Sequence, residues 1–294
     1  MLNEKNFSGI YVPTVTPFNS VMEVDWDSYN RYLEALLQNN IQGLVVNGTT
    51  GEAPTLSWEE VVALVKITKD HVRKSSKRIP IIVGTGTNCT STSVKRTEIA
   101  GEIGADAVLV VTPYYNRPSQ EGVLSHFRKV VEVGVPVIAY EVPSRTSIDL
   151  SSYTVQSILD MNGVIGLKDS TRNIDLISKI DKTKPILCGD DINFYSMLEK
   201  GASGGILASA NIHTDLFLEV YRLFNQNQVE SAKRVFDSLE PLIQRLFQES
   251  NPSPLKWVLA KQGILAHDTL RLPMCPISKE LGKQLNNLLE DFTH

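Results

Sequence analysis

The sequence predicts an α/β fold, a (β/α)8 TIM barrel with a small C-terminal helical subdomain. Strand-like and helix-like segments alternate eight times along the chain. The strand-like segments are short and rich in Val or Ile, which is typical of parallel strands buried on both faces. The alternative, an open doubly wound sheet, usually carries a glycine-rich phosphate loop after its first strand. Here Thr16, Pro17 and Phe18 follow that strand, and the later segment Gly84–Asn88 lacks a third glycine.

Eight apolar segments are expected as strands: Gly9–Val15, Gly43–Asn47, Pro80–Gly84, Ala107–Thr112, Pro136–Val142, Val164–Lys168, Pro185–Gly189 and Gly204–Ala208. Between them lie segments with helical spacing and helix start signals. Asp25 precedes the first of these, and Ser57 with Glu60 three residues later forms a capping-box pattern. Similar start residues are Ser119, Ser151 and Thr214.

The repeating units end near Asn227, so we expect residues 1–228 to form the barrel and residues 229–294 a C-terminal helical subdomain. Helical patterns cover Val229–Gln248, Leu255–Gln262 and Pro276–Glu290. The Asn-Pro-Ser-Pro segment at 251–254 separates the first two. The active site is expected in the barrel, because no chemistry is visible in the tail.

Composition excludes several classes of function. The chain has 294 residues, of which 42% are hydrophobic and 21% charged, and its net charge is −4 without a basic stripe. We therefore expect no nucleic-acid or membrane partner. No segment approaches the ~20 apolar residues that span a bilayer, and Cys89, Cys188 and Cys275 form no C-x-x-C pattern. Reduced thiols of this kind fit a cytoplasmic protein.

The five histidines show no metal-ligand spacing, so we expect no metal site. They are His71, His126, His213, His267 and His294.

Lys168 is the residue that most needs a chemical explanation. It lies in an apolar strand pattern in which Val164, Gly166 and Lys168 share one face. Burial disfavours the charged form of an amine, and a neutral amine is a nucleophile toward carbonyl carbon. Gly166 would leave room beside the lysine for a small substrate. The strand alone leaves open the alternative that the lysine ends the strand and reaches solvent.

The other unusual segments also follow strands, at the barrel end where active sites lie. Gly48-Thr49-Thr50-Gly51-Glu52 follows the second strand, Tyr114-Tyr115 the fourth, and Tyr140 ends the fifth with Arg145 shortly after. Structural interpretations exist for each: a common turn, a packed aromatic pair and a surface charge. Asp190-Asp191 is similarly interpreted as a helix N-cap. The convergence of lysine, tyrosine, threonines and arginine at one rim favours carbonyl chemistry.

These segments carry a resemblance that runs almost from end to end. The chain resembles the dihydrodipicolinate synthases, within the wider family of pyruvate-dependent Schiff-base aldolases and lyases that includes N-acetylneuraminate lyase. The matching segments are 15–18, 48–52, 84–88, 112–122, 142–146, 166–168, 189–191, 251–257 and 270–274. The resemblance implies a homotetramer built from two tight dimers, and no cofactor, because a lysine imine is itself an electron sink.

The resemblance also implies roles for single residues. Lys168 would form a Schiff base with pyruvate, and the resulting enamine would attack aspartate semialdehyde. Tyr140 would transfer protons, linked through Thr49 to Tyr115, which in the family reaches into the neighbouring subunit's site. Substrate-binding groups would be Thr50, Arg145 and Ile206. The alternative is a sister aldolase that cleaves a sugar acid, N-acetylneuraminate or a 2-keto-3-deoxy acid.

Two departures from the family pattern are visible. Glu141 and Ser147 stand where the family usually has Asn and Gly. We expect Glu141 to face away from Tyr140, toward the helices. There it either alters the structural support of the site, and not the reaction, or pairs with a nearby cation.

A candidate site for feedback by lysine is read from the same resemblance. Its positions are Ala53, Trp58, Val61, Asn88, Thr92 and Tyr114. Thr92 replaces a glutamate, and a hydroxyl offsets a desolvated ammonium less than a carboxylate does. The face of the Trp58 ring would stabilise the charged side chain of the bound lysine. The missing charge is the larger effect, so we expect weak inhibition or none.

Overall fold

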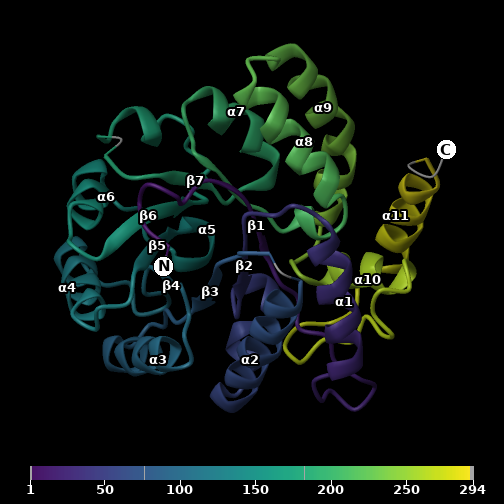
Figure 1. Ribbon diagram of the computed structural model, residues 1–294, viewed down its shortest axis with the longest axis horizontal. Helices are drawn as coiled ribbons and strands as arrows, with labels where there is room; N and C mark the ends of the chain where they lie inside the picture. The colour runs from purple at the N-terminus through teal and green to yellow at the C-terminus, as the bar shows by residue number, and fades with distance from the viewer. Residues whose placement is uncertain (1, 76, 182, 292–294) are drawn as a thin grey trace. The chain divides into compact units, whose positions relative to one another are not determined.

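The computed structural model describes residues 2–75, 77–181 and 183–291 and contains eight parallel strands in a closed barrel, ordered β1 to β8 (Figure 1). The predicted TIM barrel fold is therefore confirmed. The strands are β1 (Gly9–Pro13), β2 (Gly43–Val46), β3 (Ile81–Gly84), β4 (Ala107–Val111), β5 (Val137–Glu141), β6 (Val164–Asp169), β7 (Ile186–Cys188) and β8 (Gly204–Ile206). Each lies within its predicted segment except β6, which continues one residue to Asp169.

Packing divides the chain into two compact units. The first contains Met1–Tyr11, Gln42–Val45 and Ile79–Leu207, and the second contains Val12–Ile41, Val46–Arg78 and Ala208–His294. The first unit holds most of the barrel sheet and its interior. That interior is a cluster of large apolar side chains, among them Phe7, Tyr11, Ile82, Leu109, Ile138, Tyr140, Leu187 and Ile206.

The helices of the first unit are α3 (Thr90–Glu102), α4 (Gln120–Val131), α5 (Pro143–Thr146), α6 (Ser152–Leu159) and α7 (Phe194–Glu199). Helix α4 packs beside both α3 and α6 (Figure 1). The Ser119 and Ser151 side chains accept hydrogen bonds from Gly122 N and Thr154 N, as the helix start signals predicted.

Two connections in this unit differ from expectation. Between β6 and β7 the described residues, 170–181 and 183–185, form a short 3-10 turn, Leu176–Ser178, and no α-helix, where the alternation predicted an α-helix. Asp190 occupies the cap position of the 3-10 turn Asp191–Asn193 but makes no capping bond. Its carboxylate instead accepts from the Asn193 amide at 2.6 Å and pairs with Arg172. The Asp190 carboxylate therefore bonds a side-chain amide and a guanidinium, and not a backbone N–H of the turn that it precedes.

The helices of the second unit are α1 (Trp26–Gln38), α2 (Trp58–Lys74), α8 (Thr214–Asn225), α9 (Val229–Leu246), α10 (Ser253–Lys261) and α11 (Lys279–Asp291). The Asp25 cap and the reciprocal bonds of the Ser57–Glu60 capping box are both present. Thr214 is the first residue of α8, and its hydroxyl donates to the Ala210 carbonyl. The three predicted tail helices form, and they share a core of Leu242, Leu246, Val258, Leu281 and Leu285.

Candidate active site

Lys168 lies near the end of β6 and is 7% exposed. Its partner on the neighbouring strand is Tyr140 of β5. The lysine Nζ lies 4.3 Å from the centroid of the Tyr140 ring. Ile206, which ends β8, packs in the same apolar cluster as Tyr140. The lysine therefore does not reach solvent from a strand end, and it shares the barrel interior with the tyrosine as predicted.

The space beside the two glycines nearest the lysine, Gly166 and Gly189, is filled differently from expectation. A Cβ atom on Gly166 would lie 2.7 Å from the Phe7 ring and 2.7 Å from the Pro185 carbonyl oxygen. The space beside Gly166 is therefore filled by protein, and the expectation that it holds substrate is wrong. At Gly189 a Cβ atom would lie 2.6 Å from Lys168 Cε. Gly189 is thus the glycine that makes room for the lysine stem.

The loop after β4 presents Tyr115 to solvent. The tyrosine is 89% exposed and has a φ of 71°, in the left-handed region that side chains other than glycine rarely adopt. The neighbouring Asn116 amide donates to the Asn88 carbonyl at 2.8 Å, which fixes this loop to the loop after β3. A packed aromatic pair is therefore excluded for Tyr115, whereas Tyr114 is half-buried.

The remaining candidate effector residues are divided between the two units. In the first unit, Asn88 is half-buried and Thr92 is exposed on α3. In the second, Ala53 begins a 3-10 turn and Trp58 begins α2.

The segment after β5 carries Arg145 in the short helix α5, with its side chain exposed. Helix α5 ends at Ser147, whose φ is 57°. The family's usual glycine suits this left-handed cap, and a serine there is strained by roughly 1 kcal/mol. One departure from the family pattern therefore lies at a position where the backbone itself favours glycine.

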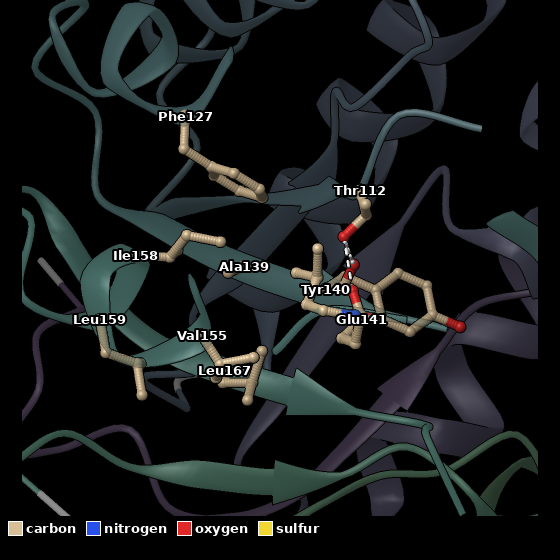
Figure 2. A pocket seen from close by; sticks show the side chains of 10 residues that line it. Thr112, Phe127, Ala139, Tyr140, Glu141, Val155, Ile158, Leu159 and Leu167 are labelled. Atoms are coloured by element: carbon tan, nitrogen blue, oxygen red, sulfur yellow. Dashed lines mark hydrogen bonds between the residues drawn. The ribbon is translucent and has the colours of Figure 1, made fainter. Parts of the chain in front are cut away.

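Glu141 is buried at the end of β5 and lines a small cavity with Phe127, Val155 and Ile158, while the Tyr140 ring points away from them (Figure 2). The expectation that it faces the helices is confirmed. Burial raises the pKa of the Glu141 carboxyl to about 7, and the hydrogen bond with Thr112 opposes that rise. The partners that the structure gives it are a hydroxyl and a backbone N–H.

In the second unit, Thr49 and Thr50 lie in the 3-10 turn Thr49–Gly51 that follows β2. The Asn251 amide donates to Thr50 Oγ1 at 3.1 Å. The Thr16 hydroxyl donates to the Gly51 carbonyl at 2.8 Å. The turn is therefore held from the loop after β1 and from the C-terminal segment.

Glu52, directly after this turn, is the centre of a buried ion pair. Its φ is 58°, and its Oε1 accepts from Lys256 Nζ at 2.7 Å. The same Nζ donates to the Thr16 carbonyl at 2.9 Å and lies 4.3 Å from the Phe18 ring centroid. Burial lowers the pKa of the Lys256 amine, and the Glu52 carboxylate opposes that effect.

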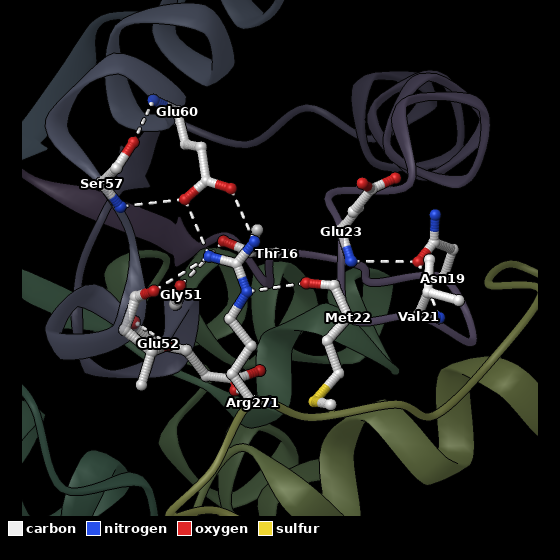
Figure 3. A network of polar contacts seen from close by, with 11 residues as sticks. Thr16, Asn19, Val21, Met22, Glu23, Gly51, Glu52, Ser57, Glu60 and Arg271 are labelled. Carbon is white, nitrogen blue, oxygen red and sulfur yellow. Dashed lines mark hydrogen bonds and ion pairs between the residues drawn. The ribbon is translucent and has the colours of Figure 1, made fainter.

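Arg271 extends the same network (Figure 3). Its backbone N donates to Glu52 Oε2 at 3.1 Å, and its guanidinium forms a two-bond pair with Glu60 at 2.6 and 2.8 Å. Its Nε donates to the Met22 carbonyl. Hydrogen bonding to Arg271 holds the pKa of Glu60 below its usual range.

Sequence reasoning missed this network, because it assigned no chemistry to the tail. The signal was Lys256, a charged residue within the apolar run of α10 that is 0% exposed in the structure. A lysine is almost never fully buried unless it is paired.

Among residues 2–75, 77–181 and 183–291, no three His, Cys, Asp or Glu side chains are grouped to hold a metal ion. Within the same ranges, no helix is both long and apolar enough to cross a bilayer.

The model of the dihydrodipicolinate synthetase family matches residues 6–292. The chain belongs to this family. A 4-hydroxy-tetrahydrodipicolinate synthase of Coxiella burnetii is 38% identical over 286 residues, which are 97% of this chain and 98% of that protein. The dihydrodipicolinate synthase of Thermotoga maritima is 34% identical, with a TM-score of 0.92 over 97% of this chain and 98% of the other.

Two further solved structures are also similar to this chain. One, described as a monomeric dihydrodipicolinate synthase variant, is 34% identical with a TM-score of 0.93 over 98% of this chain and 97% of the other. The other is the enzyme of Cyanidioschyzon merolae with lysine bound. It is 27% identical, with a TM-score of 0.93 over 97% of this chain and 98% of the other.

Proposed function

We propose that this protein is a lyase that condenses pyruvate with L-aspartate 4-semialdehyde through a lysine Schiff base. The product is 4-hydroxy-tetrahydrodipicolinate, the heterocyclic precursor of diaminopimelate and lysine. The observation that carries the proposal is the buried amine of Lys168 beside the Tyr140 ring, within a barrel of this family. A sugar-acid aldolase is not favoured, since the full-length relatives are named as synthases.

The chemistry begins at the lysine amine. The amine adds to the keto carbon of pyruvate, and loss of water gives an iminium that withdraws electrons from the adjacent methyl group. Loss of a methyl proton then gives an enamine, whose carbon attacks the aldehyde carbon. Burial supports this sequence, because bulk water would hydrolyse the imine. Tyr140 is the proposed proton donor and acceptor, because it is the register partner of Lys168 and its side chain lies beside the lysine amine in the barrel interior.

Substrate carboxylates are assigned to two places. Thr50 and its backbone N–H would hold the pyruvate carboxylate, with the Ile206 carbonyl near the same substrate. Arg145 would hold the carboxylate of the aldehyde, because a guanidinium pairs with a carboxylate through two parallel bonds. Support comes from the Asn251 bond to Thr50, which fixes the hydroxyl, and from the exposed Arg145 side chain that is open to a ligand.

We further propose a homotetramer of two tight dimers in the cytoplasm. An 89% exposed tyrosine on a loop fixed to its neighbour suits a residue that enters a second subunit's site. In that arrangement Thr49 and the partner's tyrosine would extend the proton path from Tyr140. Sedimentation velocity distinguishes this assembly from the monomeric state described for one relative. Free thiols at Cys89, Cys188 and Cys275 fit a reducing compartment.

Trapping with borohydride tests the central claim. Reduction in the presence of pyruvate should fix one pyruvate-derived mass increment per chain, located by peptide mapping on Lys168. The buried but ion-paired Lys256 serves as an internal control and should stay unmodified. No increment on the native protein, or an increment that survives Lys168→Ala, would overturn the mechanism. Steady-state assays with the aldehyde and with sugar acids then decide the second substrate.

A further inference from the structure

Glu141 joins three segments of the first unit through one carboxyl group. Its Oε2 lies 2.7 Å from the Thr112 hydroxyl, which follows β4, and its Oε1 accepts from Leu150 N at 3.2 Å. Glu141 itself ends β5, and Leu150 lies just before α6. The side chain is 1% exposed. These contacts by themselves indicate a structural role for Glu141. The segment that its carboxyl group ties down, however, contains Arg145, the residue proposed to bind the second substrate.

That segment, residues 142–150, is a loop closed at its base by the Glu141 carboxyl. Within it the Thr146 hydroxyl lies within bonding distance of the Val142 and Ile148 carbonyls, and the next residue, Ser147, has a left-handed backbone. Arg145 sits in the middle of this loop. Backbone bonds from Arg145 and Thr146 to the Val142 carbonyl hold the start of this loop, and the Gln120 side chain bonds its far end at Asp149 and Ser151. The Glu141–Leu150 bond is the contact that ties the far end of the loop back to strand β5, and so it contributes to where Arg145 stands.

The surroundings of Glu141 favour its neutral form. Two carboxylates act on it: Asp169, its register partner on β6, and Asp149, beside the bonded Leu150. Helices α4 and α6 contribute only apolar side chains to the cavity, namely Phe127, Val155, Ile158 and Leu159 (Figure 2). Burial raises its pKa to about 7, so the group changes charge close to neutral pH.

The two protonation states bond differently. In the neutral form the carboxyl O–H donates to the Thr112 hydroxyl oxygen. The threonine hydroxyl can then donate its own proton to the Tyr140 carbonyl, 3.3 Å away. Every polar atom is then satisfied without a charge in the cavity. In the ionised form the Thr112 and Leu150 donors favour the carboxylate, but the cost of burying its charge beside Asp169 is larger. Solvation of that charge therefore favours entry of water and opening of the loop.

We propose that Glu141 is a positioning residue whose neutral carboxyl closes residues 142–150 and so holds Arg145 for the carboxylate of the aldehyde substrate. Ionisation of Glu141 loosens this closure, which makes the binding of that substrate sensitive to pH. The proposal rests on the proposed function for the role of Arg145 but not for the closure itself. It also assigns a consequence to the replacement of the family's usual asparagine.

Kinetics of Glu141→Gln test the proposal, because glutamine keeps both contacts and cannot ionise. Between pH 6 and 8.5, KM for the aldehyde should rise about tenfold in the parent protein and less than twofold in the variant, while KM for pyruvate follows one curve in both. Changes in the protonation of the substrates themselves affect both proteins equally, so they do not alter the comparison. The matched control is Glu98→Gln, an exposed position on α3, which should follow the parent. An identical pH profile for the parent and Glu141→Gln overturns the proposal.

Amide hydrogen exchange measures how firmly residues 142–150 are held, and it requires no substrate. Compared at the same pH, amides 142–150 should exchange at equal rates in the two proteins at pH 6 and several-fold faster in the parent at pH 8. Equal exchange at pH 8 overturns the proposal whatever the second substrate is. Faster exchange in a parent protein that lacks condensation activity supports the closure and contradicts the proposed function instead.

Discussion

At the scale of single residues, Arg145 is where specificity for the second substrate is expected to reside. Removal of a charged hydrogen bond to a carboxylate costs about 1.5–3 kcal/mol, or roughly one to two decades in a specificity constant. Arg145→Ala should therefore lower kcat/KM for the aldehyde by that factor while borohydride still traps pyruvate on Lys168. Arg128→Ala, an exposed helix position paired with Glu121, is the control. An unchanged specificity constant would show that Arg145 does not bind this substrate.

Tyr115 should affect turnover through assembly and proton transfer. Tyr115→Phe keeps the ring and removes the hydroxyl, so kcat should fall by roughly 10²-fold or more while KM for pyruvate changes little. Sedimentation of the variant must first match the parent, since a dissociated protein would lose activity for a different reason. Full turnover in an intact oligomer would exclude this hydroxyl from the relay.

Thr92 should limit feedback by lysine. The neutral hydroxyl of Thr92, an exposed residue of α3, cannot offset an ammonium as a carboxylate does. L-lysine should therefore inhibit weakly or not at all under saturating pyruvate. Thr92→Glu should strengthen the inhibition several-fold, whereas Ser91→Glu adds the same charge one position away and should not. Near-complete inhibition of the parent at micromolar lysine would mean that Trp58 and the remaining polar groups suffice.

At the scale of elements, the C-terminal helix α10 supports the turn that contains Thr50. Lys256 and Glu52 are both fully buried, and the loss of one partner of a buried pair costs about 3–5 kcal/mol. Lys256→Met should therefore lower the free energy of unfolding by that amount, because it leaves the Glu52 charge unpaired. Urea unfolding measures the loss. The double variant Lys256→Met with Glu52→Gln should recover most of it.

The control for this prediction lies on α9. Lys233 forms an exposed pair with Asp237 one helical turn away. Lys233→Met should change the free energy of unfolding by less than about 0.5 kcal/mol. Equal losses at positions 233 and 256 would mean that the buried pair does not support the fold.

At the scale of the whole molecule, two buried groups give opposite dependences of stability on pH. The Glu141 pKa is raised from 4.5 to about 7, so the folded protein holds a proton that the unfolded chain releases, and this contribution falls as pH rises through that window. Burial lowers the pKa of His126 from 6.5 to about 4, so the unfolded chain binds the extra proton and this contribution rises with pH. Between about pH 4.5 and 6.5 the two contributions offset each other.

Single substitutions should expose each contribution. One pKa unit is worth about 1.4 kcal/mol, so over two pH units each group accounts for on the order of 2–3 kcal/mol. Glu141→Gln should make the protein more stable at pH 6.5 than at pH 4.5, relative to the parent. His126→Gln should have the opposite effect. Urea unfolding at the two pH values measures both differences, and equal pH slopes in all three proteins would contradict the assignment.

The sequence by itself determined the barrel and which side chains of β5 and β6 face its interior. Eight short apolar segments, separated by helix start signals, specify parallel strands because each segment must be buried on both faces. Alternation along β6 then places Lys168 inward, and alternation along β5 places Tyr140 inward and Glu141 outward. These are local consequences of strand periodicity, so they require no knowledge of which segments meet.

Only the tertiary structure decided what fills the space around these residues. The Phe7 ring occupies the room beside Gly166, and Asn251 and Lys256 reach the turn at 48–52 from about 200 positions along the chain. The bond from Leu150 to Glu141 likewise depends on how the chain returns from α5 to α6. Contacts of this kind depend on the path of the chain and on how its segments pack, and no periodicity within one segment records them.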